Sequence, residues 1–201
     1  MTHNPRRVVI ADAGPLIGLA RIGQLDLLPR LFGAVSVTSW VAEEVLAGGD
    51  LPDVAALKAA FAQPWLHTLT VADEDADAWE EACRALINLH QIDMGEAGAL
   101  VVAERLAAQG GAALLLIDDP RGHQAALHSR VAILGTAGLL VLAKQAGAAT
   151  GSGRCCRPCA RGLFSERPID RGGARTGGRI DRFASWCVNV LVFMHQCENF
   201  P

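Results

Sequence analysis

Short apolar runs alternate with longer stretches of helical periodicity over the first 148 residues of the chain. Four of these runs have the length and β-branched or leucine-rich character of buried strands, and a fifth alternates between apolar and polar positions. Strands that are apolar throughout and alternate with helices are typical of a parallel sheet covered by helices on both faces. The pattern therefore predicts an α/β fold. The five predicted strands are residues 8–11, 34–37, 66–71, 114–117 and 131–134.

Helix signals fill the stretches between the strands. Gly14-Pro15 opens an apolar-periodic stretch, as expected for proline in a first turn. Thr38 or Ser39 can cap the helix that follows the second strand, and the longest central helix ends at Gly110-Gly111. Helices are expected over residues 14–20, 25–31, 73–89, 93–109 and 137–146, with further helices after residue 39, from residue 52 and around residues 125–127.

The pattern changes after about residue 149. Residues 1–150 carry 10 Lys and Arg against 17 Asp and Glu, whereas residues 151–201 carry 8 Arg, no Lys and 4 acids. The sequence thus predicts a domain over residues 1–149 and an atypical Arg-, Gly- and Cys-rich tail over residues 150–201. Cys156 and Cys159 have the spacing of zinc ligands, and Cys187, His195 or Cys197 would complete such a site.

A second explanation of the tail is an out-of-frame reading of the coding sequence. With suitable codons, residues 164–178 shifted by one base give a capped, helix-periodic sequence. We therefore expect residues from about 150 onward to be a frameshift product that is largely disordered.

Composition places the chain among globular proteins with a substantial core. Hydrophobic residues make up 51%, charged residues 19%, and the mean hydropathy is +0.25. No apolar run reaches the roughly 18 residues of a membrane-spanning helix, and only four apolar residues precede Asp12, too few for a secretory signal. We expect a cytoplasmic protein without a membrane partner. Its acidic main domain would bind a phosphate backbone only through a local basic patch, a cation or a partner.

Acidic residues follow two of the predicted strands directly. Asp12 ends the first strand, and Asp118-Asp119 ends the fourth. The carboxyl ends of parallel strands share one edge of the sheet, where ligands bind. Glu44 lies one turn into the helix after the second strand and Glu96 at a helix start, and both are placed to project toward this edge. Several carboxylates in one crevice repel one another unless they are protonated or bridged, and Mg²⁺ or Mn²⁺ prefers oxygen ligands of this kind. Such a site supports phosphodiester hydrolysis.

Each of these acids also has a purely structural interpretation. Any single Asp or Glu at a strand end or helix start is commonly only a cap, and Glu43 and Asp93 are expected to be solvated neighbours. The acidic run from Asp73 to Glu81 is expected to be a solvated helix face. An aspartyl phosphatase would need a second Asp two residues after Asp12, where Gly14 stands, and a phosphorylated receiver domain would have its paired acids early in the chain.

Five segments in this order resemble the PIN-domain family, in particular its VapC-type, toxin-like branch with a Gly-Glu-Ala motif. The resemblance covers about residues 7–148. The segments are Ile10-Ala11-Asp12-Ala13-Gly14-Pro15-Leu16-Ile17, Val41-Ala42-Glu43-Glu44-Val45, Asp93-Met94-Gly95-Glu96-Ala97, Leu116-Ile117-Asp118-Asp119 and Leu134-Gly135-Thr136-Ala137-Gly138-Leu139-Leu140.

The resemblance implies a three-layer α/β/α fold with a central, mainly parallel sheet, and a Mg²⁺- or Mn²⁺-dependent ribonuclease. Asp12 would be the first metal ligand, Glu44 the acid of the second motif and Glu96 that of the third. Asp119 would be the last catalytic acid, with Asp118 as the alternative ligand. The substrate would be RNA, and the family often pairs with a small antitoxin and commonly forms homodimers.

The chain departs from the family pattern at two places. Many relatives carry Thr-Ser after the first Asp, where Ala13-Gly14 offers no hydroxyl. An Arg of this branch is replaced by His123, which together with Arg121 and Arg130 is a candidate phosphate contact. These departures leave open an alternative function, in which a catalytically impaired PIN-like protein binds nucleic acid or protein without turnover.

Overall fold

The structure is a computed structural model that describes residues 7–47, 52–70 and 75–148. The chain divides into two units, residues 1–151 and residues 152–201. The second unit lies outside the described residues, and with it the predicted zinc ligands and the proposed frameshift product. The fold of the first unit follows from the parallel sheet at its centre.

Five strands form this sheet, in the order β3-β2-β1-β4-β5. Every pair of neighbouring strands is parallel, which confirms the predicted sheet type. The first and fourth strands are direct neighbours, with Ala11 opposite Leu116. The strands are β1 (Arg7–Ala11), β2 (Val35–Thr38), β3 (Leu66–Leu69), β4 (Ala112–Leu116) and β5 (Ala132–Leu134).

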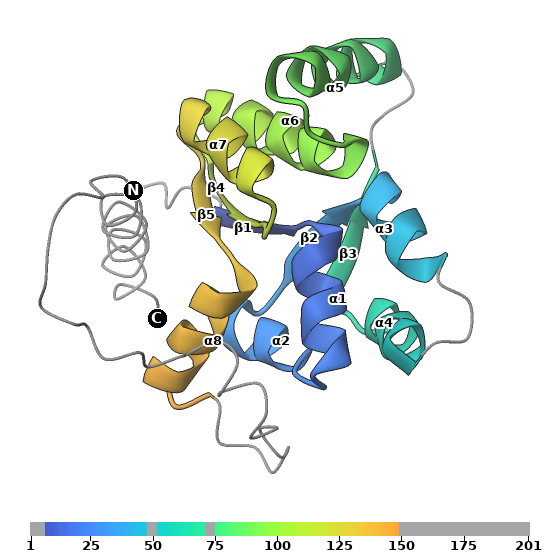
Figure 1. Cartoon of the computed structure of the whole chain (residues 1–201), viewed down its shortest axis with the longest axis vertical. Coiled ribbons are helices and arrows are strands. Elements are labelled where there is room, and N and C mark those ends of the chain that lie inside the picture. Colours follow the sequence, from blue (N-terminus) through green and yellow to red (C-terminus); the bar gives the residue numbers. More distant parts are fainter. Residues whose placement is uncertain (1–6, 48–51, 71–74, 149–201) are drawn as a thin grey trace, which may run out of the picture. The chain divides into compact units, whose positions relative to one another are not determined.

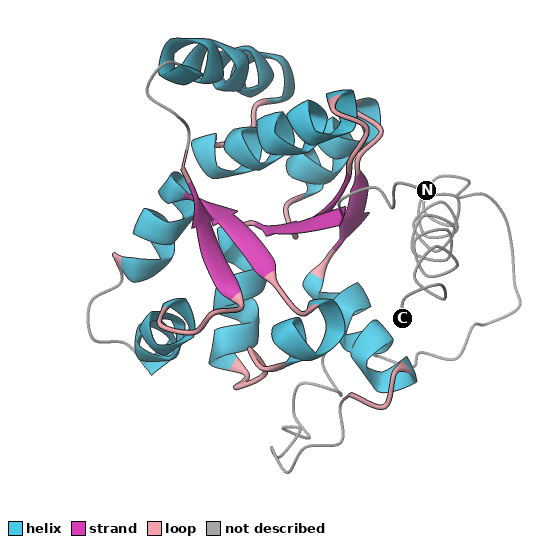
Figure 2. Ribbon diagram, turned by 180° about the vertical axis from the view of Figure 1, so that it is seen from behind, coloured by secondary structure: helices cyan, strands magenta, loops and turns pink. Residues whose placement is uncertain are grey.

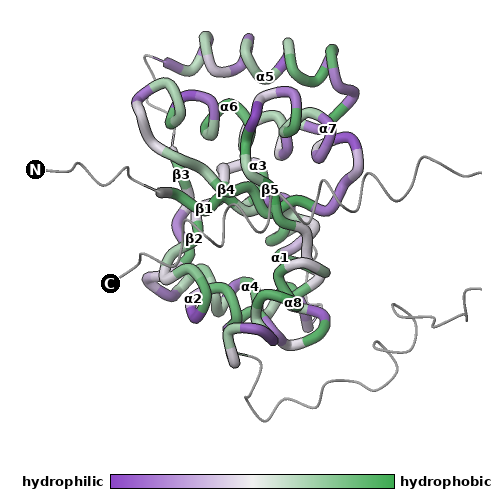
Figure 3. The backbone as a smooth tube through the Cα atoms, turned by 90° about the vertical axis from the view of Figure 1, so that its left-hand side faces the viewer, coloured by the Kyte–Doolittle hydropathy of each residue, from purple (hydrophilic) through white to green (hydrophobic). Residues whose placement is uncertain are grey.

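Helices cover both faces of the sheet, so the three-layer α/β/α architecture is confirmed (Figures 1 and 2). In Figure 3, α5, α6 and α7 lie on one face and α1, α2, α4 and α8 on the other, while α3 contacts both α1 and α6. The helices are α1 (Ala13–Arg21), α2 (Leu27–Phe32), α3 (Ser39–Leu46), α4 (Pro52–Phe61), α5 (Ala76–His90), α6 (Met94–Ala108), α7 (Pro120–His128) and α8 (Thr136–Gln145).

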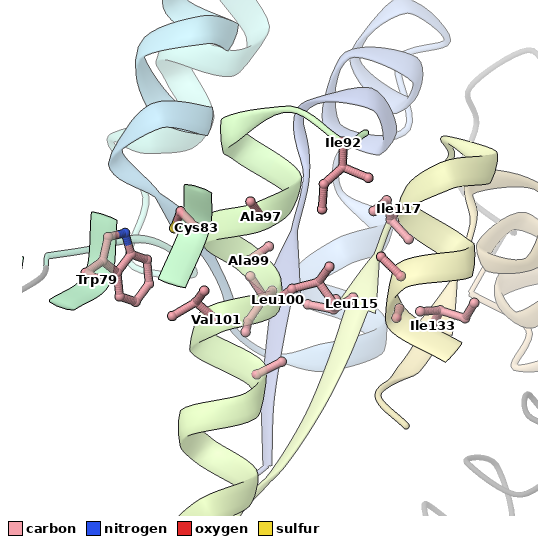
Figure 4. Packing of buried hydrophobic residues seen from close by; sticks show 14 residues of the cluster. Trp79, Cys83, Ile92, Ala97, Ala99, Leu100, Val101, Leu115, Ile117 and Ile133 are labelled. Atoms are coloured by element: carbon pink, nitrogen blue, oxygen red, sulfur yellow. The ribbon is translucent and has the colours of Figure 1, made fainter. Parts of the chain in front are cut away.

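The core between the sheet and α6 explains why one face of the central strands is apolar. Ile10 of β1 and Leu115 of β4 pack with Leu100 of α6, and each is at most 1% exposed (Figure 4). Fully burying one such side chain stabilises the fold by about 1.5–3 kcal/mol. Trp79 and Cys83 extend this cluster from α6 to α5.

Element boundaries differ from the sequence prediction mainly at caps. Thr38 rather than Ser39 caps α3, because its hydroxyl accepts the amide of Val41 at 3.4 Å. Helix α5 begins at Ala76 instead of residue 73, and residues 71–74 are outside the described part of the chain. None of the described helices is both long and apolar enough to cross a membrane.

Candidate active site

The ends of β1 and β4 bring Asp12 and the Asp118-Asp119 pair together. The amide of Asp12 donates to the carbonyl of Leu116 at 2.9 Å, which ties the chain leaving β1 to the end of β4. Gly14 lies between the two carboxylates: a Cβ on Gly14 would stand 3.8 Å from Asp12 Oδ2 and 3.9 Å from Asp118 Oδ2. The expected convergence of Asp12 and Asp118 at one edge is thus present in the fold.

A capping box at the start of α6 brings in the third acid. Asp93 Oδ1 accepts the amide of Glu96 at 2.9 Å, and Glu96 Oε2 accepts the amide of Asp93 at 3.2 Å. Glu96 is only 3% exposed, and its Oε1 has no hydrogen-bond partner among the described residues. One oxygen of this buried carboxyl group is therefore fixed, and the other is left available. Leaving a buried polar atom unpaired costs about 1–3 kcal/mol, which marks Glu96 Oε1 as an atom in need of a partner.

Two glycines allow this close approach. A Cβ on Gly122, in the first turn of α7, would lie 2.6 Å from Glu96 Oε1. A Cβ on Gly95 would lie 3.3 Å from Asp93 Oδ1 and 3.4 Å from Asp12 Oδ1. The first turns of α6 and α7 and the end of β1 therefore meet around the carboxylates.

Most of these acids also cap helices. Asp12 is the N-cap of α1, and Asp119 Oδ1 accepts the amide of Arg121 at 2.7 Å as the N-cap of α7. Asp118 accepts the amide of Thr136, at the start of α8, at 2.7 Å and the Thr136 hydroxyl at 2.6 Å. The positive ends of α1, α6, α7 and α8 consequently face the acids and favour negative charge there.

Burial and mutual repulsion raise the pKa values of the inner carboxyl groups. Burial, followed by the charges of Asp93 and Glu44, raises the pKa of Asp12 to about 6. Burial raises the pKa of Glu96 to about 7, with further contributions from the charges of Asp93, Asp12 and Asp119. Burial and Asp93 also raise the pKa of Glu44. None of the salt bridges among the described residues involves these acids, so the repulsion between them is not neutralised by a basic side chain.

Without divalent metal, we expect the free energy of unfolding to fall by about 1–3 kcal/mol as pH rises from about 4 to about 8. The pKa values of Asp12 and Glu96 are higher in the folded chain than in the unfolded chain. The stabilising contribution is therefore complete below their unfolded pKa values and is lost as pH rises through the folded ones. Urea unfolding in EDTA across this range measures it. If the free energy of unfolding of Asp12→Asn depends on pH just as that of wild type does, Asp12 is not a source of this pH dependence.

Two contributors were not singled out in the sequence. Asp93 was expected to be a solvated neighbour; it is exposed, but its carboxylate raises the pKa values of Asp12, Glu44 and Glu96 and caps the helix that holds Glu96. Thr136 supplies a hydroxyl at this edge of the sheet, whereas Ala13 and Gly14 have none to offer. The sequence signal for Thr136 was its place directly after a predicted strand and Gly135. The signal for Asp93 was the Glu three residues later, which is typical of a capping box.

The candidate phosphate contacts lie in different places. Arg121 lies at the start of α7 and donates to the carbonyl of Gln91 at 3.1 Å, which links α7 to the α5–α6 connection. His123 Nε2 is 2.7 Å from the carbonyl of Ile117, so this nitrogen donates to the backbone. Arg130 lies between α7 and β5, at the amino ends of the strands. The fold does not bring Arg130 to the acids.

The atoms that the acids offer are of the kind that a hard divalent cation prefers. They are carboxylate oxygens, which Mg²⁺ and Mn²⁺ prefer, and they include the unpaired and buried Glu96 Oε1. None of the salt bridges among the described residues involves these oxygens. Within the described residues, no three of these side chains stand close enough to hold an ion as they are placed.

A family model described as PIN domain matches residues 8–153 of the chain. The chain therefore belongs to the PIN domain family, whose fold agrees with the parallel sheet and its two helical layers. PIN domains are generally nucleases and commonly use divalent metal ions. This places the chain in a class of hydrolases that act on nucleic acid. A comparison with curated proteins gave no match.

Proposed function

We propose that the chain is a Mg²⁺- or Mn²⁺-dependent endoribonuclease that hydrolyses RNA phosphodiester bonds. The observation that carries this proposal is the buried, unpaired Oε1 of Glu96 within a set of mutually repelling carboxylates. Asp12, Glu96 and Asp119, with Asp118 beside them, would hold the ion. An ion there would provide both the missing partner of Glu96 and the missing positive charge.

When bound, the ion would polarise the phosphoryl group and lower the pKa of a water molecule, which makes hydrolysis accessible near neutral pH. The chain's own groups would then orient the substrate and move protons. Glu44 is exposed and has a raised pKa, so its carboxylate is suited to accept the proton of the attacking water. The amino ends of α1, α6, α7 and α8 would attract the scissile phosphate.

The resemblance to the VapC-type branch supports three further parts of the proposal. The chain would act as the toxin of a toxin–antitoxin pair, and it would form a homodimer. A small antitoxin would block the acidic edge of the sheet. These parts rest on the motifs at residues 10–17, 41–45, 93–97, 116–119 and 134–140.

A second candidate function is binding without turnover. The absence of a hydroxyl at Ala13 and Gly14 favours it, since those positions would otherwise support metal or phosphate. Thr136 weakens this argument because its hydroxyl bonds Asp118 at the same edge.

Incubating the full chain with a mixed RNA pool and Mn²⁺ is expected to produce discrete fragments, and EDTA should abolish them. Denaturing gel electrophoresis with end-labelled RNA measures the cleavage, and a DNA pool of matched sequence measures the preference for RNA. Equal cleavage of DNA would contradict the assignment to RNA. A folded chain that binds Mn²⁺ but cleaves neither pool would support binding without turnover.

A further inference from the structure

Two tryptophans and an arginine form a stack beside the acids. The rings of Trp40 in α3 and Trp79 in α5 are parallel within 4°, with their centroids 6.3 Å apart. The guanidinium of Arg105 in α6 lies 5.2 Å from the centroid of Trp79. Trp79 is only 4% exposed and belongs to the core (Figure 4), whereas Trp40 is half-buried and still reaches the surface. Trp40 is therefore the outer member of a stack that is anchored in the core.

Trp40 lies at the edge of the sheet that carries the candidate active site. It follows Thr38, the last residue of β2, by two positions. Glu44 is one turn further along α3, and residues four apart lie on the same side of a helix, about 6 Å apart along its axis. The charge of Glu44 in turn raises the pKa of Asp12. A half-buried aromatic ring thus lies about one helical turn from the carboxylate of Glu44.

The surroundings of Trp40 hold its ring in place. Gly98 of α6 faces the stack: a Cβ there would lie 3.4 Å from Thr38 Cγ2, 3.6 Å from Trp40 Cε3 and 3.7 Å from Trp79 Cζ2. Side chains thus already pack closely around this glycine. A ring held by its neighbours loses little conformational entropy when a ligand stacks on it.

We propose that Trp40 is the stacking platform for an unpaired nucleobase next to the scissile phosphate, and that it thereby helps to determine which bases the site accepts. This inference rests on the proposed ribonuclease function. Aromatic rings bind every base through its π-face, and stacking between neighbouring base pairs in a duplex hides that face. Stacking also supplies affinity that does not depend on positive charge. That matters because residues 1–150 carry 17 acids against 10 basic residues and cannot bind a phosphate backbone by charge alone.

The test compares Trp40→Leu with wild type on a short single-stranded RNA in which one base at a time is replaced by an abasic site. We expect Trp40→Leu to raise KM about 10-fold with little change in kcat. At one position beside the cleaved bond, an abasic site should weaken the binding of the RNA to wild type by a similar factor. The same abasic site should not weaken the binding of the RNA to Trp40→Leu any further. Trp40→Phe, which keeps an aromatic face, should recover much of the affinity and also covers the case in which Trp40→Leu fails to fold.

Trp65→Leu is the matched control. Trp65 is also half-buried but precedes β3, at the opposite edge of the sheet, and the variant should bind RNA as wild type does. Equilibrium binding measured in an Asp12→Asn background separates this inference from the ribonuclease function. Loss of binding upon Trp40→Leu without any cleavage by wild type would keep the platform and reject the nuclease. Cleavage by wild type with equal abasic penalties in both proteins would reject the platform.

Discussion

Replacing Asp12 by asparagine is expected to lower metal-dependent RNA cleavage by about 1,000-fold or more. Asp12 ends β1, and its amide is bonded to the end of β4, so its carboxylate stands at the centre of the acidic edge. Asparagine has the same shape but is a much weaker ligand for a hard cation, and it removes one negative charge from the site. The loss should appear in kcat, because the ion's contribution to the transition state is removed.

The same substitution should leave the fold intact and make it more stable in the absence of metal. Asp12 is 9% exposed, and its pKa is raised to about 6, so its ionised form is unfavourable in the folded chain at pH 8. Asparagine is neutral and is as good an N-cap as aspartate, so α1 keeps its cap. An increase of about 1–2 kcal/mol in the free energy of unfolding is expected in EDTA at pH 8. A residue that matters only as a cap would not show the loss of cleavage.

Cleavage rates and urea unfolding of the two proteins provide the measurement. Glu43→Gln is the matched control. Glu43 precedes Glu44 in α3 and is exposed, and its substitution also removes one negative charge. The Glu43→Gln protein should cleave RNA within a few-fold of wild type. Normal cleavage by Asp12→Asn would show that Asp12 acts only as a cap and that catalysis does not depend on its carboxylate.

The sheet and the position of its acids could be predicted from sequence because both depend on local patterns. The run ending at Ala11 and the run ending at Leu116 are apolar throughout, which requires a strand buried on both faces. Strands of this kind are parallel, and parallel strands place their carboxyl ends at one edge. Asp12 and Asp118 therefore had to meet once β1 and β4 were neighbours. That neighbour relation was an assumption at the level of sequence, and the observed register confirms it.

The remaining parts of the site depend on how helices distant in sequence approach one another. Asp93 was predicted to be a solvated acid, and only the contact between the starts of α3 and α6 shows that its charge acts on Glu44 and Asp12. The stack of Trp40 and Trp79 joins two residues that are 39 positions apart in the sequence. Arg130 looked equivalent to Arg121 in sequence, yet the two lie at opposite ends of α7. No local pattern carries such information.

The sequence left open whether each acid is a helix cap or a functional residue. At this site the same acidic residues can be both. Asp93 uses Oδ1 as the N-cap of α6, and the return bond from its own amide fixes Oε2 of Glu96, so that Oε1 remains the free atom. Asp119 likewise uses Oδ1 for the amides of α7. Capping thus immobilises one oxygen and orients the other. This is how a site can place carboxylates with little flexibility at the time of reaction.

Gly122→Ala is expected to lower RNA cleavage about 100-fold and to reduce the free energy of unfolding by about 1–3 kcal/mol. A Cβ on Gly122 would overlap Ile117 Cδ1 and stand 2.6 Å from Glu96 Oε1. Both are atoms at the ends of side chains, but Ile117 is 0% and Glu96 3% exposed, so neither side chain has space to move into. The methyl group must therefore displace α7 or push Glu96 Oε1 from the site. Either movement separates Glu96 from Asp119, the N-cap of α7, and misplaces two of the proposed ligands.

Gly18→Ala is the matched control for this prediction. Gly18 lies inside α1, and the nearest atom to its added Cβ would be Thr136 Oγ1 at 3.7 Å, an ordinary contact. Alanine should stabilise that helix by up to about 1 kcal/mol and leave cleavage unchanged. Cleavage assays at a temperature well below both unfolding transitions, together with urea unfolding, separate the two effects. A Gly122→Ala protein that loses stability but cleaves RNA at the wild-type rate would show that the position of Glu96 is not critical to catalysis, and the ligand set would then have to be assigned without Glu96.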